Sequence, residues 1–246
     1  METSFYFYYL ITNRIADVEI FYNTTVRDLL EPGLPNFKLN DLNITQAENH
    51  LGLSCLLVDD NNNILIGIRN NKVNVFRDAL SPTISGAANL ITCSSKNIDD
   101  SLSPLYWLQN EMNEELFLDS NDDKIKNFIY ELTTRALFLG ISRELMRLGK
   151  PEVFFAIQLT NRDTQFLKQH LLNLSQNKNE SIDQNENKDF LWINIDSIVR
   201  EYKYKNDDYF ITHSKEEYKL SESLIVNILL YLEYTSSNTS QQVNNE

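Results

Sequence analysis

Apolar and polar positions alternate along the chain in blocks that predict strands and helices in turn. The clearest block covers 51–68, where the apolar run LGLSCLLV meets a turn of Asp and Asn residues and a second apolar run follows. Two such runs joined by a polar turn predict a β-hairpin with at least one strand buried on both faces. Apolar runs of strand length predict further strands at 137–141, 152–160 and 190–195.

The first 50 residues have their own pattern and form a predicted N-terminal extension, 1–50. Aromatic and β-branched residues at 5–11 and 18–22 favour two strands. Thr24 or Thr25 is expected to cap a short helix that stops at Pro32-Gly33. The main domain is expected at 51–234.

Helices are expected within this main domain at 104–118, 122–137, 163–174 and 221–234. The first of them has a recognisable start, with Ser103 as N-cap and Pro104 at the first helical position. The polar, low-complexity segment 175–189 predicts a mobile insertion. The composition of 235–246 predicts a disordered tail.

The helix predicted at 104–118 carries three glutamates close together. At about 100° per residue, its expected core face consists of Leu105, Leu108, Met112 and Leu116. Glu111, Glu114 and Glu115 fall on an adjacent arc at positions i, i+3 and i+4. Clustered carboxylates repel one another, and a divalent cation removes the repulsion because Mg²⁺ prefers oxygen ligands. For the helix alone, a solvated acidic face is the alternative.

The surroundings of this helix resemble the Nudix hydrolase family. A hairpin and a small-residue loop with Gly86 precede it, and the run Asn110-Glu111-Met112-Asn113-Glu114-Glu115-Leu116 is similar to the second half of the family's sequence box. The resemblance implies an α+β fold, namely a Nudix-type α/β/α sandwich with a mixed β-sheet. It also implies that Glu111, Glu114 and Glu115 coordinate Mg²⁺ or Mn²⁺. Asn110 replaces the box arginine, and the box's first glutamate has no counterpart, with Asp99 or Asp100 as candidate substitutes.

A narrower resemblance covers about residues 50–234. The segments 139–143 (LGISR) and 149–155 (GKPEVFF) are similar to the Nudix subgroup that includes the UDP-glucose/UDP-galactose pyrophosphatase. It implies hydrolysis of the pyrophosphate bond in a nucleoside diphosphate linked to another moiety, with a UDP-sugar favoured. Glu114 or Glu115 would accept the proton of the attacking water. Arg69 and Arg143 are the candidate substrate-binding residues, because a guanidinium presents a fork of donors to phosphate.

Charge and composition limit the partners. The 35 acidic and 22 basic residues give a net charge of −13, which disfavours nucleic acid and anionic membranes. No apolar stretch reaches about 20 residues, and the N-terminus lacks the features of a signal peptide. We therefore expect a cytoplasmic protein with a small-molecule partner, and a homodimer remains open. Cys55 and Cys93 are expected to be buried thiols, and His50, His170 and His213 surface residues.

Three classes of function follow from these patterns. The leading one is a metal-dependent pyrophosphohydrolase. The second is a Nudix-fold module that binds a nucleotide without cleaving it, which the missing glutamate and Asn110 favour. The third is an acidic scaffold whose helix carboxylates are only solvated and whose insertion and tail bind a partner.

Overall fold

The structure is a computed structural model that describes residues 16–31, 38–42, 45, 47, 50–70, 78–87, 103–117, 120–176, 187–206 and 208–243. The chain divides into two compact units. The first consists of Met1–Leu53 with Gly140–Val153, and the second of Ser54–Leu139 with Phe154–Glu246. The predicted strand at 5–11, the stop at Pro32-Gly33, Cys93, Asp99 and Asp100 lie outside the described residues.

In the first unit a small hairpin leads into a short capped helix. Strands β1 (Glu19–Phe21) and β2 (Thr24–Thr25) pair antiparallel, and helix α2 (Val26–Leu30) follows directly. Thr25 and Asp28 form a capping box in which each side chain accepts a hydrogen bond from the other residue's backbone N–H, at 3.2 and 2.8 Å. The predicted N-cap is therefore confirmed at Thr25.

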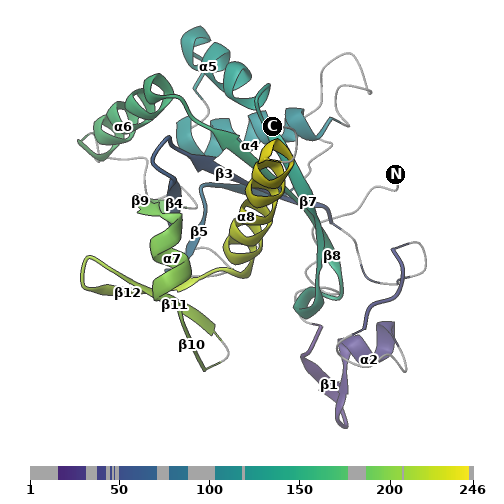
Figure 1. The fold of residues 1–246 in the computed structure, drawn as a ribbon. Coiled ribbons are helices and arrows are strands. Elements are labelled where there is room, and N and C mark those ends of the chain that lie inside the picture. Colours follow the sequence, from purple (N-terminus) through teal and green to yellow (C-terminus); the bar gives the residue numbers. More distant parts are fainter. Residues whose placement is uncertain are drawn as a thin grey trace, which may run out of the picture. The chain divides into compact units, whose positions relative to one another are not determined.

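A large mixed sheet is the main element of the fold (Figure 1). Its strand order is β10-β11-β12-β5-β4-β3-β8-β7, with β6 paired to β3 and β9 paired to β4. Strand β12 runs parallel to β5, whereas β4 runs antiparallel to β3, β5 and β9. The strands are β3 (Gly52–Val58), β4 (Asn63–Arg69), β5 (Leu80–Pro82), β6 (Ile84–Ala87), β7 (Leu137–Glu144), β8 (Lys150–Gln158), β9 (Asn187–Asn194), β10 (Lys203–Lys205), β11 (Asp208–His213) and β12 (Glu216–Leu220). This sheet and its helices confirm the α+β class.

The predicted hairpin at 51–68 is present as β3 and β4. Leu57 pairs with Leu65 and Val58 with Ile64, and all seven residues of β3 are buried. Asp59 shapes the turn, because its Oδ1 accepts the backbone N–H groups of Asn61 and Asn63, both at 2.9 Å. The prediction of a strand buried on both faces is therefore confirmed.

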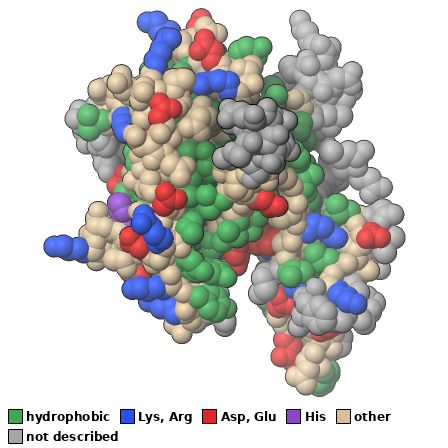
Figure 2. Space-filling view, in the orientation of Figure 1, with side chains coloured by type: hydrophobic (Ala, Val, Ile, Leu, Met, Phe, Trp, Pro, Cys, Tyr) green, Lys and Arg blue, Asp and Glu red, His purple; other side chains and the backbone are tan. Residues whose placement is uncertain are grey.

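One apolar core joins the sheet to helices α7 (Ile195–Glu201) and α8 (Glu222–Val243). It contains alternate residues of β4 together with apolar residues of both helices: Ile64, Ile66, Ile68, Ile195, Ile198, Leu224, Ile228 and Tyr231. Hydrophobic side chains also gather on the face of Figure 2 over the position of α8, and Leu229 on this helix is 58% exposed. Cys55 is fully buried and free, as expected.

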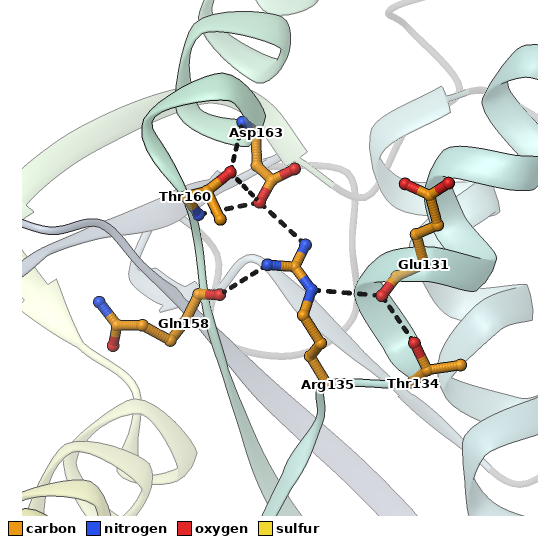
Figure 3. A network of polar contacts seen from close by, with 6 residues as sticks. All are labelled: Glu131, Thr134, Arg135, Gln158, Thr160 and Asp163. Carbon is orange, nitrogen blue, oxygen red and sulfur yellow. Dashed lines mark hydrogen bonds and ion pairs between the residues drawn. The ribbon is translucent and has the colours of Figure 1, made fainter.

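An arginine-centred network fixes the ends of three elements (Figure 3). Arg135 follows helix α5 (Asp123–Thr133) and donates to the carbonyl oxygens of Glu131 and Gln158, both at 3.3 Å. It also donates to Asp163 Oδ2 at 2.8 Å. The same carboxylate accepts the Thr160 hydroxyl and N–H at 2.7 and 2.8 Å, and so caps helix α6 (Asn161–Gln176).

Two sequence predictions near the C-terminus were wrong. The strand at 190–195 is not the last, because α7 and the meander β10–β12 follow it. Helix α8 continues to Val243, so 235–243 is helical, whereas our prediction was a disordered tail. The hydroxyls of Thr235 and Ser236 donate to carbonyls of the preceding turn, at 2.9 to 3.1 Å, which is compatible with continued helix.

The polar segment 175–189 is also shorter than predicted. Helix α6 extends to Gln176 and strand β9 begins at Asn187, which leaves 177–186 outside the described residues. Among the helices that the structure describes, none is long and apolar enough to cross a membrane.

Candidate functional site

The predicted glutamate helix is present as α4 (Pro104–Phe117), and the three glutamates on it differ in burial. Leu108, Met112 and Leu116 are fully buried, as predicted. Glu115 lies about 20° from Leu108 on the helical wheel, Glu111 about 60° and Glu114 about 120°. Accordingly, Glu115 is buried, Glu111 half-buried and Glu114 exposed.

Leu105 and Trp107 depart from the simple core arc. Leu105 was expected in the core but is 39% exposed, because it lies in the first turn of the helix. Trp107 is 3% exposed and packs in the interior. Whether a side chain of α4 is buried therefore depends on its position along the helix as well as on its position around the helix axis.

Glu111 lies directly against Gly86. The segment expected to be a small-residue loop forms the short strands β5 and β6, and β6 packs against α4. A Cβ on Gly86 would collide with the carboxylate of Glu111, so any larger residue there would force this side chain to move. The structure thus brings together Gly86 and Glu111, two residues of the region whose sequence resembles the Nudix box.

Glu115 is held by an amide from a distant strand. Asn187 Nδ2 donates to Glu115 Oε2 at 2.7 Å, and both residues are buried. The Asn187 amide occupies the space above Gly67 on β4, where an ideal Cβ would lie 2.5 to 2.9 Å from its atoms. Gly67 therefore provides the room for the contact between Asn187 and Glu115.

A β-bulge places Asn187 at this position. The register between β4 and β9 pairs Ile68 with Asp189 but Arg69 with Asn187, so Lys188 is the extra residue. Without the bulge, Lys188 would stand opposite Arg69; instead it forms an ion pair with Asp78. Bulges re-aim side chains in this way.

Arg69 belongs to the same group of residues. It is 8% exposed and lies directly opposite Asn187 across the β4–β9 pair. Side chains alternate along a strand, so Arg69 points to the same face of β4 as Gly67. The predicted substrate arginine and the predicted metal ligand Glu115 therefore flank one buried asparagine.

Arg143 has a different environment, within the first unit. Its guanidinium donates to the carbonyl oxygens of Gly149 and Asn40, at 3.1 and 2.5 Å. Gly149 has a φ of +83°, and a Cβ there would collide with the arginine side chain. These contacts close the turn between β7 and β8; substrate binding by Arg143 remains a prediction.

The three glutamates do not form a ready-made metal cage. Among the described residues, no group of three or more His, Cys, Asp or Glu side chains is arranged to hold a metal ion. The burial gradient explains this, since the carboxylates face the interior, the Gly86 strand and solvent in turn. Mg²⁺, however, is commonly held by one or two carboxylates together with substrate phosphates. The carboxylate oxygens of Glu111 and Glu115 are of the chemical type that Mg²⁺ prefers.

His170 also differs from its prediction as a surface residue. It is half-buried, its ring centroid lies 4.7 Å from that of Phe117, and its Nε2–H donates to the Leu116 carbonyl at 2.9 Å. Burial lowers the pKa of this imidazole, against the opposing effect of the hydrogen bond. His170 therefore packs against Phe117 and hydrogen-bonds the C-terminal end of α4.

Comparison with known proteins gives no family. The sequence matches no protein-family model, and no curated protein matches it significantly.

Proposed function

We propose that this chain is a Nudix-type α/β/α sandwich that hydrolyses the pyrophosphate bond of a nucleoside diphosphate linked to another moiety, with Mg²⁺ or Mn²⁺ as cofactor. A UDP-sugar is the favoured substrate, giving UMP and a sugar 1-phosphate. The observation that carries the proposal is the pairing of Gly86 with Glu111 on the helix that also presents Glu115.

Each side chain has a distinct task in this proposal. Glu111 and Glu115 would hold the cation, which when bound neutralises phosphate charge and acidifies water. Glu114 is exposed, so it is better placed than the buried Glu115 to accept the proton of the attacking water. Arg69 would donate to phosphate oxygens from the neighbouring strand β4.

A substrate panel tests this proposal. The protein is incubated with UDP-sugars, ADP-ribose, NAD and nucleoside triphosphates, with Mg²⁺ or Mn²⁺, and products are separated by chromatography. We expect metal-dependent release of a nucleoside monophosphate, reduced at least about 100-fold in Glu115→Gln. Glu201→Gln, on α7, is the matched control and should retain full activity. No product from any substrate, together with no metal-induced melting shift, would overturn the proposal.

Gly86→Ala gives a second test of the same site. The added Cβ displaces the Glu111 carboxylate, whereas the φ of Gly86 is not in the left-handed region, so alanine fits the backbone. We expect activity to fall while the melting temperature stays close to that of the wild type. Unchanged activity would show that the position of Glu111 over Gly86 is not needed for turnover.

A nucleotide-binding module without turnover is the second candidate. It is favoured by the missing three-carboxylate group among the described residues. In the substrate panel this module would be stabilised against heat by a nucleotide but would release no product.

A further inference from the structure

Asn187 contacts the candidate site through the NH₂ end of its amide, whereas the carbonyl end has no partner among the described residues. Its NH₂ group donates to Glu115 Oε2 at 2.7 Å. A carboxylate only accepts hydrogen bonds, so this contact fixes the amide orientation and directs Oδ1 away from Glu115. Asn187 Oδ1 is buried and has no hydrogen-bond partner within the described part of the chain, although the residue is only 3% exposed.

An orphaned acceptor at this depth is costly, and it points to a ligand that supplies the missing donor. Burying a carbonyl without a partner costs about 1–3 kcal/mol, so native proteins rarely leave one unpaired. Two local features maintain the arrangement: Gly67 leaves room for the amide, and the bulge at Lys188 turns Asn187 toward α4.

We infer that Asn187 is a positioning residue of the site: its amide N–H orients Glu115, and its Oδ1 accepts an O–H donor of the bound ligand. That donor is either a water of the cation's hydration shell or a ribose hydroxyl of the nucleotide. Mg²⁺ keeps several of its waters, which are strong donors, and outer partners of this kind orient the metal ligands. The inference rests on the proposed function, since it assigns Glu115 to the cation.

Two probes separate the two donors. Mn²⁺ alone is titrated into the protein and followed by the electron paramagnetic resonance of the free ion. UMP is titrated in the presence of EDTA and followed by calorimetry. We expect Asn187→Ala to raise the Kd of one probe about 10- to 100-fold. A change confined to Mn²⁺ identifies the metal-bound water as the donor, and a change confined to UMP identifies the ribose hydroxyl.

Matched variants keep the test independent of folding. Asn194→Ala, at the other end of β9, removes a hydrogen bond to the Asn61 carbonyl and the side-chain N-cap of α7, and should leave both affinities unchanged. Asn187→Asp keeps the size of the side chain but places a second carboxylate beside Glu115. On addition of Mn²⁺, the melting temperature of this variant should rise more than that of the wild type, because the bound cation removes the repulsion between the two carboxylates. If Asn187 has only a structural role, Mn²⁺ should raise both melting temperatures equally.

The outcomes distinguish this inference from the proposed function. If the wild type binds Mn²⁺, Glu115→Gln weakens binding, and both Asn187 variants behave as the wild type, the role of Asn187 is overturned and the proposed function stands. If the wild type binds neither Mn²⁺ nor UMP, both proposals fail together.

Discussion

The space above Gly67 leads to a quantitative prediction about stability. In Gly67→Ala the new Cβ would lie 2.5 Å from Asn187 Oδ1 and 2.6 Å from its Cγ, so the amide must move away from Glu115. Loss of a hydrogen bond to a buried charged group costs about 1.5–3 kcal/mol, and overpacking about 1–3 kcal/mol. Alanine offsets about 0.4–1 kcal/mol through the unfolded chain. Together these terms predict that the free energy of unfolding falls by about 1.5–5.5 kcal/mol.

Urea unfolding followed by circular dichroism measures this change. With a slope of about 2 kcal/mol/M, the unfolding midpoint should fall by about 1–3 M. The decisive measurement is a double-mutant cycle with Asn187→Ala, which removes the side chain that the Cβ meets. In that background Gly67→Ala should cost less than about 1 kcal/mol. Strictly additive effects of the two substitutions would refute the steric coupling.

Two further predictions concern helix α4 and the arginine network. Leu116→Ala should lower the free energy of unfolding by about 2–5 kcal/mol and Leu105→Ala by less than about 1 kcal/mol, because only Leu116 is fully buried; equal losses in urea unfolding would contradict this. Burial raises the pKa of Asp163, but hydrogen bonds from Thr160 and Arg135 outweigh it and hold the pKa below its usual 3.8. The wild type should therefore exceed Asp163→Asn in melting temperature above about pH 4, and this advantage should decrease as the pH falls toward the folded pKa; an advantage that does not change with pH would exclude this linkage.

Long periodic segments of the sequence predicted their elements well. The hairpin, the start of α4 and the position of β8 all follow from apolar periodicity and capping residues, which act over a few neighbouring positions. In these cases local sequence and tertiary packing favour the same structure.

The meander β10–β12 was missed although a signal exists in the sequence. Tyr and Lys alternate along β10, and Asn206, Ser214 and Lys215 adopt positive φ in the turns between strands. The alternation is short and polar, so its strands depend on tertiary packing of Ile211 and Leu220 in the core. Such packing is not visible in a local pattern.

The residue that binds Glu115 could not be predicted for a different reason. Asn187 lies at the end of a polar, low-complexity segment, and a one-residue change of register decides whether Asn187 or Lys188 faces the helix. The register is set by the pairing of whole strands. Gly67 was the available hint, since a glycine inside an apolar strand often marks a close approach of another group.

The contacts of Arg135 have a consequence for the dynamics of the second unit. One guanidinium bonds to the last turn of α5, the final carbonyl of β8 and the capping carboxylate of α6. Loss of any one of these partners removes part of the support for the other two segments. We therefore expect the backbone amides at the ends of these three segments to exchange with solvent through one shared opening, which native-state hydrogen exchange would test.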